Sequence, residues 1–560
     1  MSDYIKEPSK KYDLITNLEQ IQHLKWQGEF GKNEKKIGRW IAIWKGQTLE
    51  AVNRWYSEDG LQSGLQTELI NNYWSKADIY VYGEYYNHQK QGVWKFIIQD
   101  NMIVGGLYKQ GQKVGKWIDL NDSVQNQNQI VYNGEYKNGN KIGLWNILYK
   151  SKDSNYKIIG GGQYDENGQK NGRWIDLNNV FWNKSEVIYH GQYKNGIKIG
   201  KWDTYSRVDQ NQPFKKTGGG LYDEQEGQKY GQWIELSNSF YSECQIYYKG
   251  EYKKDKKISK WNILYKFINT PLQQIGGGSY DQEGLQNGRW KELSTNFWNK
   301  SEIIYSGEYK SGVKIGRWDI VYGILQIGGG SYLQGQKDGK WVEISDNFYD
   351  YSQVTYKGEY VSTKKKGIWN IFYNDQQIGG GSYDYQEGLK NGIWIELSNN
   401  FYNSSKVIYK GEYKSGIKIG IWDISFKQHS YQNWEIIGGG EYDDLGLKIG
   451  EWVDINDDFW DESQVTYTGI YQNSKKVGTW SIRFRDSYRK IWNLIGGGEY
   501  DENGLKTNKW RVLGDNFGDE NQTTFAGQYK KNKKVGRWVE FRYGHEQNVF
   551  VYNENGKKIY

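Results

Sequence analysis

Apolar and polar residues alternate along many short stretches of this chain, and the stretch VIYHGQYKNGIKIGKWDTY, residues 187–205, is representative. Alternation at every second residue is typical of a β-strand with one buried face. The dipeptide Asn195-Gly196 stands at its centre, and both residues suit a two-residue type I′ turn, which needs positive φ twice. The pattern therefore predicts a β-hairpin with one aromatic and one polar face.

Pairing outward from that turn sets Tyr189 opposite Trp202 and Gly191 opposite Gly200. Tyr189, Trp202 and Thr204 then lie on the aromatic face. The two facing glycines leave room for rings of neighbouring strands to lie flat across the backbone. The residues that we expect to define the repeat are Tyr189, Gly191, Gly200, Trp202, Gly411, Gly420 and Trp422.

Near-copies of this hairpin recur throughout the sequence, and we call them A hairpins. Their tryptophans are Trp40, Trp94, Trp145, Trp202, Trp261, Trp318, Trp369, Trp422, Trp480 and Trp538, with a spacing of 51 to 59 residues. A second series lies between them, each member preceded by a phrase such as GGGQYDENGQKNGRW, residues 160–174. We call these B hairpins and predict that Tyr164 lies opposite Trp174 across a loop of Gly168, Gln169 and Lys170.

Consecutive hairpins with short connections predict an all-β fold, an elongated antiparallel meander of about forty strands with little helix. So long a sheet should be twisted or coiled. We divide the chain into residues 1–25, a polar segment that could form a capping helix, and a continuous array of about ten double repeats over residues 26–560. The first B hairpin carries Gln66 where the others carry tryptophan.

The composition changes this picture little. Gly 70, Tyr 49 and Trp 27 stand beside Pro 3, so aromatic rings must supply most of the buried surface. A net charge of +7 spread over 141 charged residues does not indicate nucleic acid. The single cysteine, Cys244, excludes an intrachain disulfide and favours a reducing compartment. No apolar run is long enough for a membrane span, so we expect a cytoplasmic protein.

The link after each B tryptophan carries a pair of aromatic residues. Examples are LNNVFWNKSEV (residues 177–187), LSTNFWNKSEI (293–303) and LSNNFYNSSKV (397–407). An aromatic sheet face of this length should not remain exposed. We expect either that these links fold over the sheet or that a partner covers it.

Candidate chemistry is sparse, because nearly every polar residue has equivalents in the other repeats. The five histidines lie in different repeats without metal-ligand spacing, and the IGGG phrases lack the Gly-Lys-Ser/Thr ending of a phosphate loop. Calcium at the acidic turns and sugar or choline binding by the rings are weaker alternatives. We expect no enzymatic activity, no cofactor and no metal.

The turns carry charge of alternating sign. Acidic residues mark the B turns, as in DENG, residues 165–168. If both kinds of turn lie on one edge of the sheet, that edge carries alternating charges and suits a periodic protein partner or self-association. If they lie on opposite edges, the sheet has a basic rim, which favours binding of lipid or nucleic acid. The candidate partner-contact residues of the basic A turns are Lys194, Lys198, Lys253, Lys254, Lys256, Lys257, Lys364, Lys365, Lys366, Lys530, Lys531, Lys533 and Lys534.

The pattern Y-x-G-E-Y-K-x-G-x-K-x-G-x-W resembles the membrane occupation and recognition nexus (MORN) repeat, in a divergent form with a terminal tryptophan. The resemblance extends from about Trp26 to the C-terminus over about eighteen units. It implies stacked β-hairpins and a role as a scaffold or tether, often on cytoskeletal, ciliary or membrane-contact structures. The GGG phrases, the double period and the aromatic links depart from the plain pattern.

Our leading hypothesis is therefore a non-enzymatic scaffold that organises or spans a large cytoskeletal or ciliary assembly and binds its other proteins. The alternative is a peripheral membrane tether whose basic turns bind anionic lipids. Self-association fits the striped edge, and we expect no nucleic-acid partner.

Overall fold

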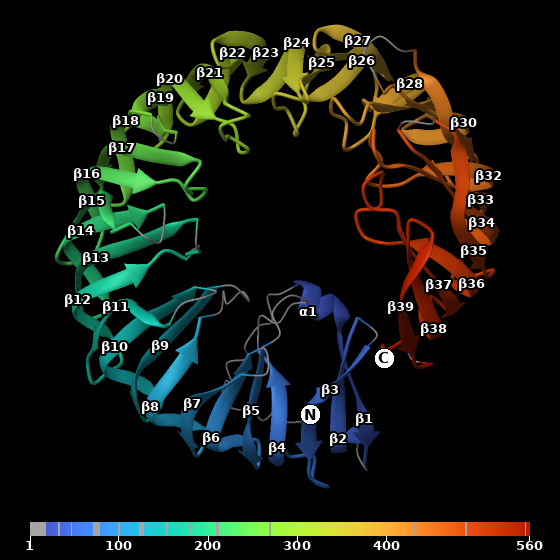
Figure 1. Cartoon of the computed structure of the whole chain (residues 1–560). Coiled ribbons are helices and arrows are strands. Elements are labelled where there is room, and N and C mark those ends of the chain that lie inside the picture. The colour runs from blue at the N-terminus through green and yellow to red at the C-terminus, as the bar shows by residue number, and fades with distance from the viewer. Residues whose placement is uncertain are drawn as a thin grey trace, which may run out of the picture. The chain divides into compact units, whose positions relative to one another are not determined.

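The structure is a computed structural model, and it describes residues 18–31, 34–45, 47–70, 79–98, 101–121, 128–151, 155–179, 181–182, 184–208, 212–267, 270–428, 433–487, 490–554 and 556–559. It contains 39 strands over these residues, and successive strands pair antiparallel (Figure 1). The predicted meander of tandem β-hairpins with little helix is confirmed. The chain divides into two compact units, residues 1–275 with 280–284 and residues 276–279 with 285–560.

The first unit contains one short helix and eighteen complete strands. They are α1 (Leu18–His23), β1 (Leu24–Phe30), β2 (Lys36–Trp44), β3 (Gln47–Tyr56), β4 (Gly64–Leu69), β5 (Ile79–Tyr86), β6 (Gln89–Ile98), β7 (Asn101–Lys109), β8 (Gln112–Leu120), β9 (Asn128–Lys137), β10 (Asn140–Ser151), β11 (Lys157–Tyr164), β12 (Lys170–Leu177), β13 (Glu186–Lys194), β14 (Ile197–Arg207), β15 (Lys215–Tyr222), β16 (Lys229–Leu236), β17 (Gln245–Lys253) and β18 (Lys256–Lys266). Strand β19 (Gln273–Tyr280) contributes residues to both units.

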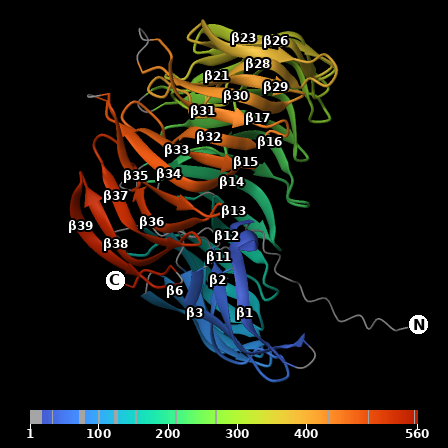
Figure 2. The ribbon, with the colours of Figure 1, turned by 90° about the vertical axis from the view of Figure 1, so that its right-hand side faces the viewer.

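The second unit contains twenty complete strands, of which those near the C-terminus follow one another in sequence order in the side view (Figure 2). They are β20 (Gln286–Leu293), β21 (Ile303–Lys310), β22 (Val313–Tyr322), β23 (Leu325–Leu333), β24 (Gln336–Ile344), β25 (Val354–Val361), β26 (Lys364–Tyr373), β27 (Gln376–Tyr383), β28 (Lys390–Leu397), β29 (Val407–Lys414), β30 (Ile417–Phe426), β31 (Glu435–Tyr442), β32 (Lys448–Ile455), β33 (Gln464–Gln472), β34 (Lys475–Arg485), β35 (Trp492–Tyr500), β36 (Lys506–Leu513), β37 (Thr523–Lys530), β38 (Lys533–Arg542) and β39 (His545–Tyr552).

A short helix, α1, lies within the predicted N-terminal segment. Helix α1 has six residues and leads directly into β1, whereas the expected segment began at residue 1; residues 1–17 lie outside the described part of the chain. No helix among the described residues is long and apolar enough to cross a membrane.

The A hairpins have the predicted turn and a different register. In the hairpin of β13 and β14, Asn195 and Gly196 both have positive φ (48° and 78°), as a type I′ turn requires. A bulge then shifts the pairing, so that Tyr189 lies opposite Thr204. The prediction that Tyr189 faces Trp202 is therefore wrong.

The physical reason for the bulge is the tryptophan ring. The Trp202 indole lies on Gly191, where an added Cβ would be 2.0 Å from the ring atom Cδ2. Gly200 does not face Gly191 as predicted; it has φ of 61° within the bulge, with open space beside it. One signature glycine thus makes room for a ring, and the other allows the backbone to bulge.

The B hairpins also depart from the predicted register. Tyr164 pairs with Lys170, and Trp174 pairs with Gly162 instead of Tyr164. The loop is longer than predicted, because the carboxylate of Asp165 accepts hydrogen bonds from the backbone N–H groups of Asn167 and Gln169 and closes a turn of five residues. The acidic residue that begins this turn is therefore part of its structure.

The A and B turns lie on the same edge of the sheet. The backbone N–H of Gly196, in an A turn, donates to the carbonyl of Lys170, which follows the neighbouring B turn, at 2.9 Å. Turn side chains of opposite sign meet there, as in the Lys137–Glu166 pair at 3.2 Å. The alternating charge stripe is confirmed as a structural feature, and the opposite-edge arrangement is excluded for these hairpins.

The aromatic links fold onto the sheet at the edge opposite the turns. The first aromatic residue of each pair is buried: Phe401 packs edge-on against Tyr373 with ring centroids 5.3 Å apart, and Phe181 packs in the same way against Tyr149. The second stays partly exposed, as at Tyr402. The links therefore cover the strand ends, in agreement with the expectation that they fold over the sheet. The row of tryptophans lies beside a groove.

Candidate binding groove on the aromatic face

A row of alternating tyrosine and tryptophan rings crosses the strands of each unit, interrupted in the first unit at Gln66. In the second unit Trp422 lies edge-to-face between Tyr413 and Tyr442, with centroid distances of 5.2 and 6.2 Å, and Tyr442 meets Trp452 at 5.0 Å. This is the preferred geometry of aromatic pairs. Each period thus repeats the same rings at the same positions and presents a regular aromatic floor.

A lysine lies over nearly every tryptophan of this floor; at Trp290 the equivalent position is Gln286. The ammonium Nζ of Lys418 is 3.8 Å from the ring centroid of Trp422, and that of Lys448 is 4.1 Å from Trp452. These are cation–π contacts, in which the positive charge is attracted to the ring face. Each lysine precedes its tryptophan by four residues and therefore lies on the same face of the sheet.

In eight of the nine B hairpins, a carboxylate two residues after the tryptophan position binds these lysines. Asp454 accepts from Lys448 at 2.6 Å and from the Tyr471 hydroxyl at 2.7 Å, and it pairs with Lys476 at 3.5 Å. Eight positions carry this carboxylate, each bound by a tyrosine hydroxyl and at least one lysine. They are Glu68, Asp119, Asp176, Glu235, Glu292, Glu343, Glu396 and Asp454.

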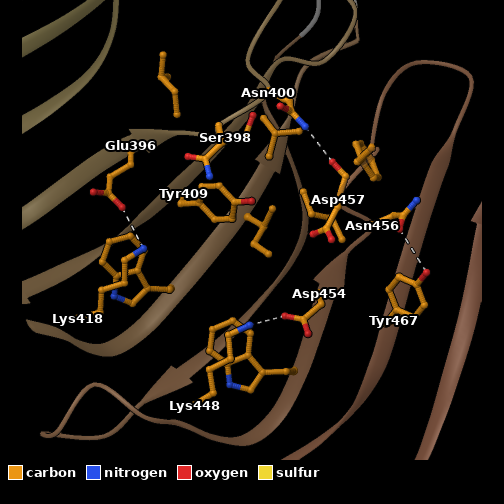
Figure 3. Close-up of a pocket in the computed structure, with 18 of the residues that line it drawn as sticks. Glu396, Ser398, Asn400, Tyr409, Lys418, Lys448, Asp454, Asn456, Asp457 and Tyr467 are labelled. Atoms are coloured by element: carbon orange, nitrogen blue, oxygen red, sulfur yellow. Dashed lines mark hydrogen bonds and ion pairs between the residues drawn. The ribbon is translucent and has the colours of Figure 1, made fainter. Parts of the chain in front are cut away.

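The links form the second wall of a groove beside this row (Figure 3). Its cavity in the second unit has a volume of about 860 Å³ and runs from Glu396 to Lys476. Asn400 and Asn456 of the links point into it, and the side-chain amide of Asn400 donates to the carbonyl of Asp457 at 3.2 Å. The first unit has an equivalent cavity of about 940 Å³ with the same kinds of residue.

The groove shifts the protonation of its own side chains. Burial lowers the pKa of Lys418, and the carboxylate of Glu396 opposes that shift. Burial works to raise the pKa of Glu396, but Lys390 and Lys418 hold it below its ordinary value. Burial raises the pKa of Tyr442 to about 12. The groove therefore offers paired charges, ring faces and neutral hydroxyls, which are groups for binding and for positioning a partner.

The links are joined to one another by a ladder of buried hydrogen bonds. The hydroxyl of Ser405 donates to the carbonyl of Phe459 at 2.6 Å, and Phe459 is 3% exposed. The same bond joins Ser185 to Phe240, Ser301 to Phe348, Ser352 to Phe401 and Ser463 to Phe517. The described links of the second unit thus form a second layer beside the sheet.

A second hollow of about 700 Å³ lies on the link layer of the second unit. Four successive links each contribute a partly exposed ring to its lining, Trp298, Tyr349, Tyr402 and Trp460, beside three buried phenylalanines and several asparagine and aspartate residues. These four rings are half-buried, so they are held in position while part of each remains accessible. The hollow is a periodic, amphipathic surface.

The structure places the predicted turn lysines in three settings. Exposed on the turn edge are Lys194, Lys253, Lys254, Lys256, Lys364, Lys530, Lys531 and Lys533. Folded over tryptophan rings on the aromatic face are Lys198, Lys257, Lys365 and Lys534. Lys366 is buried and donates to the carbonyl of Tyr385 at 2.5 Å. For the last five the assignment to exposed turns is wrong, because a residue paired with an aromatic-face tyrosine, as Lys198 is with Tyr193, shares its face.

Three of the exposed turn lysines, Lys256, Lys364 and Lys530, form ion pairs with carboxylates of neighbouring turns. Lys256 pairs with Glu283 at 2.8 Å and Lys364 with Glu387 at 2.7 Å, each joining an A turn to a B turn. Exposed pairs of this kind contribute little to stability, at most about 1 kcal/mol. They do lower the local net charge of the edge.

Sequence reasoning missed the row of carboxylates, although a signal was present. An acidic residue stands two positions after the B tryptophan in phrases such as WID (174–176), WIE (233–235) and WVD (452–454). Side chains two apart on a strand share a face, so each of these carboxylates had to lie beside the rings. The acidic residues of the turns were predicted, and this row of strand carboxylates was not.

These features define a tandem β-hairpin repeat protein with a repeated groove of aromatic rings and paired charges. No group of three or more histidine, cysteine, aspartate or glutamate residues able to hold a metal ion occurs within the described ranges. No protein-family model and no curated protein matches the chain.

Proposed function

We propose that this protein is a non-enzymatic scaffold that binds other proteins of a large assembly along its repeats. The observation that carries the proposal is the recurrence of one Lys–Trp–Tyr–carboxylate set at eight positions. Catalysis needs one arrangement distinct from its surroundings, whereas an evenly repeated surface suits a partner that is itself extended or periodic. The MORN resemblance supports the same function and, by itself, a cytoskeletal or ciliary location.

The link layer is the surface that best fits a protein partner. Trp298, Tyr349, Tyr402 and Trp460 line one hollow at intervals of one double repeat, and aromatic residues are enriched in protein interfaces. The ladder of serine hydrogen bonds holds them at fixed spacing, which lowers the entropic cost of binding.

Membrane attachment through the turns is the competing function. An anionic bilayer would attract the exposed lysines but repel the acidic B turns that alternate with them on the same edge. Because charges of both signs lie on this edge, we assign the turns to a solvent-exposed rim and not to a lipid-binding surface.

Cross-linking of the full chain in extracts of its native source, followed by mass spectrometry, tests the proposal. We expect protein cross-links that persist in detergent and 0.5 M salt, that are lost in the double variant Tyr349→Ala/Tyr402→Ala, and that remain in the control Lys253→Ala/Lys254→Ala. Binding to phosphatidylserine vesicles that 0.5 M salt removes, and that only the lysine variant abolishes, would instead establish the membrane tether.

A further inference from the structure

The last B hairpin of the array breaks the carboxylate pattern. The residue two positions after Trp510 is Val512, where the eight earlier B hairpins have aspartate or glutamate. The rest of the set is kept: Lys506 precedes Trp510 by four residues, Lys534 belongs to the next A hairpin, and Tyr529 occupies the usual tyrosine position. Only the shared anion is replaced.

Both lysines nevertheless have the groove geometry. The Nζ of Lys506 is 4.7 Å from the ring centroid of Trp510 and 5.2 Å from that of Tyr529, and the Nζ of Lys534 is 4.5 Å from Trp538. Both side chains are partly buried. The charged groups are thus held at the aromatic face and do not extend freely into solvent.

Compensation by acidic side chains is weak at this position. Within the described residues, neither Lys506 nor Lys534 has an ion pair within 4.0 Å, and the Tyr529 hydroxyl makes no hydrogen bond. Burial lowers the pKa of Lys506, and the neighbouring Lys476 and Lys534 lower it further. Burial also lowers the pKa of Lys534, which Asp515 partly offsets.

We propose that Lys506, Lys534 and Tyr529 form a binding site for the carboxylate of an acidic side chain from another polypeptide. In the equivalent set around Asp454, the carboxylate meets two lysines at 2.6 and 3.5 Å and a tyrosine hydroxyl at 2.7 Å. A bound aspartate or glutamate makes the same three contacts here in trans. The site follows from the repeat geometry, and only the source of the carboxylate rests on the proposed scaffold function.

The neighbouring apolar residues favour a carboxylate on an aliphatic stem. Val512 packs against the aromatic cluster, and Phe525 stands where other A hairpins have a tyrosine, such as Tyr467. The methylene groups of a glutamate can lie on these two side chains while its charged end meets the lysines. A phosphate group carries no such stem and presents more charge and more oxygen atoms than the eight internal carboxylates do.

Fluorescence anisotropy with a fluorescein-labelled peptide of alternating glutamate and glycine tests the site in the full chain. We expect saturable binding, at least tenfold weaker in Val512→Asp, because the new carboxylate occupies the lysines as Asp454 does. Val512→Ile should bind like the wild type. Asn532→Asp adds the same charge at an exposed turn, where Asp255 is a native precedent, and should change binding less than twofold.

A gain-of-function variant provides a second test. Asp454→Val should create an equivalent site at Lys448 and Lys476 and raise the number of bound peptides from one to two. The proposal is overturned if Val512→Asp binds as the wild type does, or if the matching glutamine–glycine peptide binds equally well. A phosphoserine peptide or phosphatidylserine vesicles could instead bind more tightly than the glutamate peptide and lose that binding in Val512→Asp. That result would overturn the acidic side chain as the occupant. Failure of this test leaves the link-layer cross-links of the scaffold proposal as they are.

Discussion

Replacing Gly411 by alanine tests the packing principle of the whole array. A Cβ at this position would lie 2.3 Å from Cδ2 and 2.4 Å from Cγ of Trp422. Ordinary carbon–carbon contacts are about 3.5–4.0 Å, so the ring or the strand must move by more than about 1 Å. The ring cannot easily do so, because Tyr413 and Tyr442 flank it and Lys418 covers it at 3.8 Å.

We therefore expect Gly411→Ala to cost about 3 kcal/mol, the upper end of the usual range for overpacking. Gly420→Ala is the matched control in the same hairpin: nothing lies within 4 Å of its added Cβ, and only its φ of 61° opposes the change, at about 1 kcal/mol. The two substitutions add the same methyl group, so their difference isolates the contact with the ring.

Local stability is the quantity to measure, because long repeat arrays need not unfold in one step. Hydrogen–deuterium exchange of peptides covering residues 407–426 should accelerate about 100-fold in Gly411→Ala and about fivefold in Gly420→Ala. In a Trp422→Leu background the cost of Gly411→Ala should fall below about 1 kcal/mol. Equal effects of the two glycine substitutions, or no coupling to Trp422, would refute the reasoning.

Three further changes test the groove and the links. Glu396→Gln should destabilise the fold by about 2 kcal/mol at pH 7. The pKa of Glu396 is lower in the folded protein than in the unfolded chain. The stability difference between wild type and variant should therefore disappear as the pH falls from the ordinary glutamate pKa through the folded-state pKa. Urea unfolding from pH 3 to 7 measures this difference. Burial raises the pKa of Asp461 to about 6, so the contribution of this residue to stability should fall as the pH rises from about 4 to 6, and Asp461→Asn should remove roughly 1 kcal/mol of pH dependence. Ser405→Ala should cost about 1–2 kcal/mol of stability, because it leaves the buried carbonyl of Phe459 without its hydrogen-bond donor. Ser405→Thr keeps the hydroxyl and should cost less in the same urea unfolding experiment.

The sequence was sufficient for the hairpins and their order, because local signals dictate them. Asn195-Gly196 demands a turn with two positive φ values, and the double period of tryptophans counts the hairpins. The register was not predictable by extending the pairing from the turn. It depends on the space that the Trp202 ring needs over Gly191, which is a contact between strands and not a property of either strand alone.

The groove was predictable only in part, for a related reason. A lysine next to a turn reads as exposed in sequence, yet Lys198 crosses to the aromatic face because it pairs with Tyr193. Asp176 could have been placed on that face from the sequence, because it follows Trp174 by two residues. That it binds Lys170 of its own strand together with Tyr193 of the next strand requires the three-dimensional order of the hairpins.

Exceptions within so regular an array are informative, and two of them, Gln66 and Val512, differ in kind. Gln66 replaces a B tryptophan, and its side-chain amide donates to the carbonyls of Trp55 at 3.0 Å and Ser63 at 3.3 Å, the same bonds that the Trp452 indole makes to Glu441 and Ile449. This change conserves the structural role. Val512 conserves none of the contacts that its carboxylate equivalents make, and the residues around it keep their positions. A substitution that removes an anion and retains all its binding groups is explained by an anion supplied from another chain. Of the two positions, Val512 is therefore the more informative one to mutate, and Val512→Asp is the variant that tests it.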